Sequence, residues 1–332
     1  SIFEIFKIFN FPIFEIFKNI FSFQKICFLH DKKYFSSIFS SIFFIFQSHS
    51  LSLSVLRIIC LVLLLSDLTS TTANHMTIIE DGGIPAFLAL CNSPDLMSQY
   101  YVGCALANLS CSLSNHPIIV EAGGLQAIIA ICHSQDPDVH QQAAAALRGL
   151  SVTFSNKMKI VQEGALAPLA HLLGSDDVEI LREVVACLSN LAVSDENKYE
   201  IVKAGTVAAL ISLSQSSDMI VSSQSCATLA NLAELKSNQD AIANEGAIRP
   251  TIAVMRSKYI EVQREAGRLL ANLCASESEF TNMIVEAGGH NLLISYLLSN
   301  DTASQRVGSM GICNLCTQMR WDDVKSPSFN VI

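Results

Sequence analysis

The sequence lacks the residue patterns from which catalytic and metal sites are built. It contains a single tryptophan, Trp321, and eight scattered histidines, none of which pairs with a second histidine at the spacing of a metal site. No phosphate-binding loop of the form Gly-x-x-x-x-Gly-Lys-Ser/Thr, no Gly-x-Ser-x-Gly elbow and no His-Glu-x-x-His motif occurs. We therefore expect no enzymatic activity, no cofactor and no metal.

Positive charge is also scarce. The chain has 21 Lys and Arg against 30 Asp and Glu, a formal net charge of −9. The imbalance is concentrated in residues 80–318, which hold 13 basic and 24 acidic residues. Because an acidic surface repels nucleic-acid phosphates, the composition excludes nucleic acid as a direct partner. It favours a protein partner with some basic character.

Long hydrophobic runs are missing as well. Residues 58–65 form an uninterrupted apolar run of eight residues, whereas a membrane-spanning helix needs about 20. The 11 cysteines include one close pair, Cys313-x-x-Cys316, which has no second pair to complete a tetrahedral metal site. We interpret most cysteines as small buried hydrophobes of a protein in a reducing compartment, the cytosol or the nucleus.

Glycines recur with a fixed period. They follow acidic or helix-ending stretches at positions 82, 123, 164, 205, 246 and 288, at intervals of 41, 41, 41, 41 and 42. A period of this length marks a repeated supersecondary unit, not a single helix or strand. Such units stack into a solenoid whose hydrophobic core runs along the stack. We therefore expect one elongated domain.

Two asparagine series keep the same period. The first, which we call the asparagine ladder, comprises Asn108, Asn190, Asn231, Asn272 and Asn314, with Gly149 at the equivalent position of one unit. The second comprises Asn74, Asn115, Asn156, Asn197 and Asn238, each opening a short segment that ends at the next periodic glycine. Asparagine caps helix N-termini by accepting a bond from a free amide, and glycine ends helices in the left-handed conformation. The second series therefore predicts the N-caps of a short first helix.

Two further helices are predicted after each glycine. Residues 165–173 are apolar, and Pro85, Pro168 and Pro250 fall in the first turn of such segments, where a helix tolerates proline. A polar turn and a longer segment follow. In residues 178–191 of that longer type, apolar residues recur at helical spacing along one face. The chain is therefore predicted to be all-α, with three helices in each repeat.

These features together resemble the armadillo repeat. The shared pattern is Glu-x-Gly-Gly-x-x-x-Leu-x-x-Leu, a polar turn, and Val-Gln-x-x-Ala-x-x-x-Leu-x-Asn-Leu, as in residues 121–124 and 262–273. The resemblance covers residues 80–318 and implies a right-handed α-solenoid of about six repeats, each with three helices and a period of 41–42 residues. The sequence pattern most resembles that of the fungal vacuolar armadillo protein and its relatives. It departs from importin-α, which carries tryptophan four residues before the ladder asparagine.

The ends of the chain differ from the repeats. Residues 1–50 form a low-complexity sequence that holds 14 of the 18 phenylalanines. We interpret them as disordered or artefactual, with a membrane-associated amphipathic tail as the alternative. Counting back one period from the ladder reaches Asp67, so residues 51–79 are interpreted as a truncated leading repeat whose third helix comprises residues 55–69. Residues 319–332 are interpreted as a C-terminal tail.

In the armadillo family the third helices line a concave groove, so the resemblance implies a partner-binding surface there. The predicted groove residues are Tyr100, Tyr101, Asn108, Gln141, Gln142, Arg182, Glu183, Asn190, Gln224, Asn231, Arg264, Glu265, Arg268, Asn272, Arg306 and Asn314. We hypothesise that the ladder amides clamp the backbone of an extended partner segment, because an amide offers both a donor and an acceptor to peptide groups. The flanking Tyr, Gln, Glu and Arg would select partner side chains. The alternative is that each ladder amide bonds to the neighbouring repeat and stabilises the stack.

The resemblance implies a non-enzymatic adaptor or scaffold that binds extended segments of other proteins. Two alternatives are the substrate-recognition part of a ubiquitin ligase and a transport receptor. The expected location is the cytoplasm, with the cytosolic face of a vacuolar or other membrane, or the nucleus, as further options. Membrane contact would be indirect or would use a lipidated N-terminus missing from this sequence. The sequence does not indicate an oligomeric state.

Overall fold

The computed structural model describes residues 66–276 and 278–318, and this part of the chain consists of helices and turns without strands. The first helices of successive units are α5 (His75–Glu80), α8 (His116–Glu121), α11 (Phe154–Gln162), α14 (Asp195–Lys203), α17 (Lys236–Asn244) and α20 (Ser278–Glu286). The second helices are α6 (Gly83–Cys91), α9 (Gly124–Ile131), α12 (Leu166–Leu172), α15 (Val207–Ser214), α18 (Ile248–Val254) and α21 (Gly289–Leu297). The third helices are α7 (Leu96–Leu109), α10 (Pro137–Ser151), α13 (Val178–Leu191), α16 (Met219–Leu232), α19 (Ile260–Leu273) and α22 (Thr302–Gln318). Two short 3-10 turns, η3 (Thr72–Asn74) and η4 (Leu113–Asn115), precede α5 and α8.

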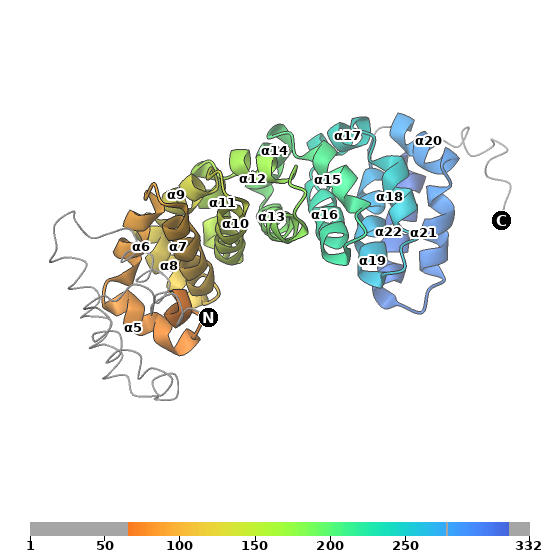
Figure 1. Cartoon of the computed structure of the whole chain (residues 1–332). Helices are drawn as coiled ribbons and strands as arrows, with labels where there is room; N and C mark the ends of the chain where they lie inside the picture. Colours follow the sequence, from red (N-terminus) through yellow and green to blue (C-terminus); the bar gives the residue numbers. More distant parts are fainter. Residues whose placement is uncertain (1–65, 277, 319–332) are drawn as a thin grey trace, which may run out of the picture.

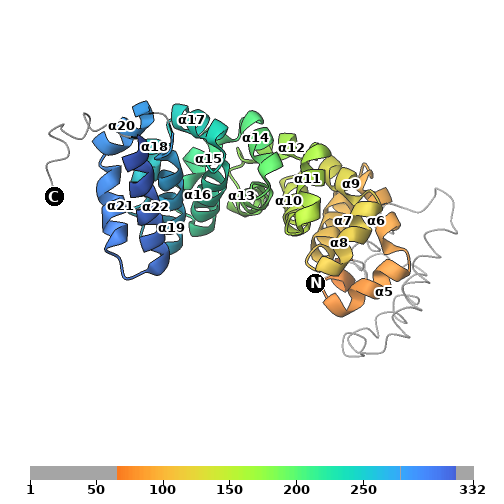
Figure 2. The same cartoon turned by 180° about the vertical axis from the view of Figure 1, so that it is seen from behind.

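The three-helix units stack in chain order into a solenoid. Each third helix contacts the third helix of the next unit, from α7 through α10, α13, α16 and α19 to α22. Figure 1 shows the units following one another from α5 (orange) to α22 (blue), and Figure 2 shows the same order from behind. The prediction of an all-α solenoid with three helices per repeat is confirmed.

The periodic glycines end the first helices in the predicted conformation. All six, at positions 82, 123, 164, 205, 246 and 288, have positive φ, from 76° at Gly205 to 91° at Gly164. A side chain there would be strained because Cβ crowds the following carbonyl in the left-handed region. The glycine therefore reverses the chain between the first and second helices of each unit.

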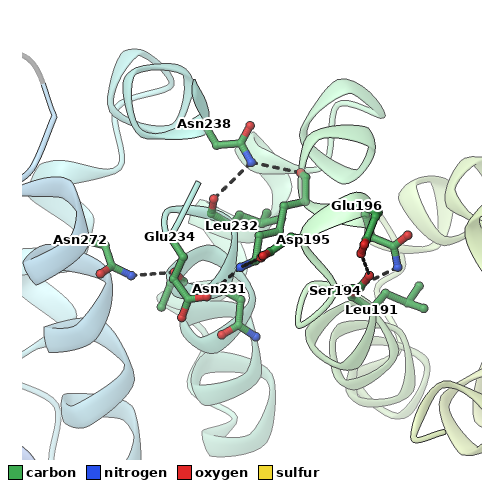
Figure 3. A network of polar contacts seen from close by, with 12 residues as sticks. Leu191, Ser194, Asp195, Glu196, Asn231, Leu232, Glu234, Asn238 and Asn272 are labelled. Carbon is green, nitrogen blue, oxygen red and sulfur yellow. Dashed lines mark hydrogen bonds and ion pairs between the residues drawn. The ribbon is translucent and has the colours of Figure 1, made fainter. Parts of the chain in front are cut away.

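The side chains of the second asparagine series do not cap the first helices as predicted, although Asn74 and Asn115 stand at the N-cap positions of α5 and α8. Asn197 lies inside α14, and its Nδ2 donates to the Leu191 carbonyl at 3.1 Å and to the Lys157 carbonyl at 3.1 Å. Asn238 makes the same pair of bonds, to Leu232 O at 3.2 Å and to Lys198 O at 3.1 Å (Figure 3). The reason is that the last carbonyls of a helix lack intrahelical donors. These amides therefore donate to the end of the preceding third helix and to the preceding repeat.

Aspartates perform the capping, at the start of the third helices. The carboxylate of Asp95 accepts from the Ser98 amide at 2.8 Å, and that of Asp218 accepts from the Val221 amide at 2.9 Å. Asp136 and Asp177 cap α10 and α13 in the same way. Each such cap contributes about 1 kcal/mol. A negative side chain also suits the positive end of the helix dipole.

The core is a continuous hydrophobic spine along the stack. Phe87, Leu106 and Leu147, from neighbouring units, are fully buried. The cysteines of the second and third helices contribute as expected, since Cys91, Cys132, Cys187, Cys226 and Cys274 are buried free thiols. Burial raises the pKa of the Cys132 thiol to about 12, so it stays protonated. By contrast, Cys313 and Cys316 are exposed.

Several predictions concern residues outside the described part of the chain. The interpretations of residues 1–50 and 319–332, and of residues 55–65 as a helix, lie there. Residues 66–69 are helical and precede η3. None of the helices in the described residues has the length and apolar character needed to cross a lipid bilayer.

Candidate partner-binding surface on the third helices

All sixteen predicted groove residues lie on the third helices, from α7 to α22. Most are half-buried, whereas Asn231 is buried and Arg306 is exposed. Because neighbouring third helices are in contact, these side chains form one row along the stack. We call this row the groove surface. Within the described residues, no group of three His, Cys, Asp or Glu could hold a metal ion.

The ladder amides donate to the preceding repeat. Asn272 Nδ2 donates to Ala230 O at 2.9 Å, and Asn314 Nδ2 donates to Ala271 O at 2.8 Å. Asn231 bonds to Ser189 O at 3.3 Å, and Asn190 bonds to Ser151 Oγ at 3.0 Å. The bond from Asn272 to the preceding helix is visible in Figure 3. The ladder therefore links each third helix to the one before it.

The ladder oxygens remain largely open. Among the described residues, only the Asn231 oxygen accepts a hydrogen bond, from Arg268 Nη2 at 2.8 Å. None of the other ladder oxygens is among the buried polar atoms that lack a partner, which means that they reach solvent. Asn108, Asn190, Asn272 and Asn314 thus use their nitrogens in the stack, and their oxygens accept no hydrogen bond from the described residues.

Gly149 interrupts the ladder for a steric reason. A Cβ at this position would lie 2.1 Å from Ser110 Oγ and 2.9 Å from the Ser110 carbonyl. Ser110 is held in place because its hydroxyl donates to Ala107 O at 2.7 Å. An asparagine therefore cannot fit where the period would place it.

Two arginines of the groove surface bind the cap of the next third helix. Arg182 Nη2 lies 2.6 Å from Asp218 Oδ2, and Asp218 caps α16. Arg264 donates to Asp301 from Nη2 at 2.8 Å and from Nε at 3.1 Å. These bonds lower the pKa of both carboxyl groups. The guanidinium groups that were expected to select partner side chains therefore cross-link neighbouring repeats.

Arg268 is the centre of a second charged group. Its Nη2 donates to Asn231 Oδ1 and lies 2.9 Å from Glu265 Oε2, at an angle outside the hydrogen-bond range. Its Nη1 lies 3.8 Å from Glu234, which also accepts from Lys198 Nζ at 2.8 Å. The charges of Glu265 and Arg268 on α19 and of Glu234, just after α16, therefore largely neutralise one another.

The surface on α7 and α10 has a different character. Tyr100 and Tyr101 meet edge to face with ring centroids 5.0 Å apart. The neighbouring Cys104 thiol and burial raise the pKa of Tyr100 to about 12, so its hydroxyl stays neutral. Within the described part of the chain, the side-chain amides of Gln141 and Gln142 form no hydrogen bond that fixes them.

A further periodic series was missed in the sequence. His75, His116, Lys157, Lys198 and Gln239 stand 41 residues apart and are buried. Lys157 Nζ donates to Ser151 O at 2.6 Å and to Asn190 O at 2.7 Å, which joins the ends of α10 and α13. Burial lowers the pKa of this ammonium group. The common spacing was the available signal, but the change of residue type from histidine to lysine to glutamine hid it.

The repeats of this chain match a known family of repeats. A family model described as Armadillo/beta-catenin-like repeat matches residues 72–111, 115–152, 153–193, 194–234 and 236–275. Helices α20 to α22 lie beyond these matches. A search of curated proteins found no match.

Several solved structures are similar. An engineered protein from a structural genomics consortium is 28% identical with a TM-score of 0.78, and the match covers 85% of this chain and 69% of that one. A second engineered protein is 30% identical with a TM-score of 0.67, covering 71% of this chain and 98% of that one. A designed armadillo repeat protein in complex with the peptide (KR)4 is 21% identical with a TM-score of 0.64, covering 70% and 99% of the two chains. This last likeness concerns the fold alone.

Proposed function

We propose, since the matched repeats show that the chain belongs to the armadillo-repeat family, that it is a non-catalytic adaptor that holds an extended segment of a partner protein along the groove surface. The fold is one that typically serves protein binding. The cytoplasm or the nucleus is the proposed compartment, supported by nine described cysteines that are all free thiols. The kinship with the fungal vacuolar armadillo protein stays a prediction.

One observation carries this proposal. Asn108, Asn190, Asn272 and Asn314 have their amide nitrogens engaged with the preceding repeat and their oxygens open to solvent. An amide that is already fixed loses little side-chain entropy when a ligand binds. Its oxygen can accept from the backbone N–H groups of an extended segment, whatever the sequence of that segment. The stack bond and the clamp are therefore compatible uses of one side chain.

The test is peptide selection on the full chain. A display library of random dodecapeptides is panned on the protein, and the affinities of enriched peptides are compared between wild type and the double variant Asn108→Ala, Asn190→Ala. Each lost contact removes about 1 kcal/mol, so we expect binding to fall about tenfold or more. The control is Asn197→Ala, because Asn197 is buried in α14, away from the groove surface, and also joins two repeats.

The control separates binding from stability. Asn197→Ala should lower the Tm and leave peptide affinity unchanged. If the ladder variant lowers the Tm while all selected peptides bind as before, the ladder serves only the stack and the proposed clamp is wrong.

A further inference from the structure

We propose that the partner segment binds at the α7 and α10 end of the groove surface, and that it is uncharged, free of acidic residues, and carries aromatic or proline side chains. This inference rests on the proposed function. It concerns five residues, which we call the neutral bay: Tyr100, Tyr101, Asn108, Gln141 and Gln142. It places the partner segment at one end of the groove surface and states which side chains that segment carries.

The first step is that the charged groove residues of α13 and α19 are already engaged in ion pairs. Arg182 is held by Asp218 and by Glu179, each at 2.6 Å. Arg148 forms an ion pair with Glu183, so α10 and α13 are joined at the border of the bay. A charged partner side chain would have to compete with these partly exposed ion pairs.

The same holds further along the stack. Arg264 makes a two-bond contact with Asp301, and Arg268 is surrounded by Glu265, Glu234 and the Asn231 oxygen. The Asn231 oxygen is therefore occupied, unlike the other ladder oxygens. From α13 to α19 the charged side chains are therefore engaged with one another, whereas the oxygens of Asn190 and Asn272 are not.

The second step is that the neutral bay carries no charge of its own and that its two glutamines are not bonded within the described residues. The amides of Gln141 and Gln142 have no fixed partner within the described residues, and each offers two donors and an acceptor to peptide groups. Asn108 uses its nitrogen on Ser66 O and Thr69 Oγ1, at 3.4 and 3.2 Å, which leaves its oxygen. Tyr100 and Tyr101 stay neutral because burial and the Cys104 thiol raise the pKa of both hydroxyls.

The third step concerns the side chains of the partner. The two tyrosine rings provide an aromatic surface on which an aromatic or proline ring can pack. Cys104 and Ala145 stand four residues before ladder positions 108 and 149, and both are small and half-buried. They add apolar surface to α7 and α10 beside the polar groups of the bay. The carboxylates of Asp67 and Asp138 act on the tyrosines from outside the bay. They would repel an acidic segment.

The experiment uses the dodecapeptide library on the full chain with two matched variants. Gln142 and Gln224 occupy the same register position, two repeats apart, on α10 and α16. Gln142→Glu places a charge in the neutral bay without changing side-chain volume, whereas Gln224→Glu places it between the paired groups. Both side chains are half-buried, so both variants are expected to fold, which circular dichroism and the Tm verify.

We expect peptides selected on wild type to be poor in Asp and Glu and rich in aromatic residues and proline. Their affinity should fall tenfold or more in Gln142→Glu and stay within twofold in Gln224→Glu. Panning on Gln142→Glu should instead enrich peptides containing Lys or Arg. These results together support the neutral bay as the partner site.

Two other outcomes overturn the inference, and only the second also overturns the proposed function. Peptides that are charged, or that lose affinity in Gln224→Glu but not in Gln142→Glu, would place binding in the paired region, and the adaptor function would stand. If no peptide is enriched, or if the enriched peptides ignore both charges and also the Asn108→Ala, Asn190→Ala variant, both the inference and the proposed function are wrong.

Discussion

Arg182 and Asp218 are thirty-six residues apart in the chain, and together they join two repeats and start a helix. Arg182 donates from Nη2 to Oδ2 at 2.6 Å and from Nε to Oδ1 at 3.3 Å. The Oδ1 atom of Asp218 also accepts from the Val221 amide and so caps α16. One carboxylate therefore caps the helix and bonds to the neighbouring repeat. Its partner, Arg182, is one of the residues that the sequence predicted to contact a binding partner.

Arg182→Met should lower the Tm by a few degrees at neutral pH and by less in acid. Arg182 holds the pKa of Asp218 below its ordinary value of 3.8. The stabilisation is therefore present above that value and is lost as the pH falls through the lower pKa of the folded state. Thermal melts of both proteins from neutral pH to about pH 3 measure the difference. A Tm difference that stays constant down to the lowest pH would contradict this role.

Lys157→Gln should change how stability depends on alkaline pH. Burial lowers the pKa of Lys157 from 10.5, so the unfolded chain binds this proton more tightly than the folded one. The free energy of unfolding of the wild type should therefore rise with pH through the window between the lowered pKa and 10.5. Glutamine occurs at this position in another repeat, where Gln239 donates to Ala233 O at 2.9 Å.

The measurement is the urea midpoint of wild type and variant from about pH 8 to about pH 10. Other groups titrate equally in both proteins, so the wild type minus variant difference isolates Lys157. A difference that stays flat across this range would show that Lys157 binds its proton equally in both states.

Asn238→Ala should destabilise the protein more than Asn156→Ala. Asn238 is 1% exposed and donates to two buried carbonyls, those of Leu232 and Lys198. Asn156 donates only to Leu150 O, at 3.1 Å. Each lost hydrogen bond costs about 1 kcal/mol, so we expect the larger midpoint shift in urea for Asn238→Ala, which loses two. Equal shifts would mean that the bond between repeats contributes nothing.

Gly164→Ala should cost about 1–2 kcal/mol for purely conformational reasons. Gly164 has a φ of 91°, and a Cβ there would meet no atom within 4 Å. The matched control is Gly174→Ala, where φ is ordinary and the nearest atom to a new Cβ is His171 O at 3.4 Å. The control should be neutral or slightly stabilising, because alanine restricts the unfolded chain. Urea unfolding measures the stability of the two variants. Equal free energies of unfolding would contradict the left-handed turn at Gly164.

Much of the fold could be predicted because its signals are local. A left-handed residue after a helix requires glycine, and an amphipathic helix shows its period within about a dozen residues. The six glycines and the apolar stripe of residues 178–191 therefore placed the helices and the repeat correctly. The positions of the groove residues on the third helices followed from the same period.

The roles of individual polar side chains could not be predicted in this way. An asparagine near a helix start can accept from a free amide or donate to a free carbonyl, and the choice depends on which group lies nearby. For Asn197 that group is Lys157 O, forty residues away in sequence. The aspartate caps show the opposite case, because Asp95, Asp136, Asp177 and Asp218 keep the 41-residue spacing and local reasoning could have found them.

The sequence of this chain settled the length, order and type of its helices, since backbone conformation depends on neighbours within a few residues. Which side chains remain free for a partner was settled by the stacking of repeats, since a contact such as Arg182 with Asp218 exists only once two units lie against each other. Gln141 and Gln142 keep free side-chain amides, whereas the arginines of α13 and α19 are held in ion pairs. Their free groups are a property of the assembled solenoid.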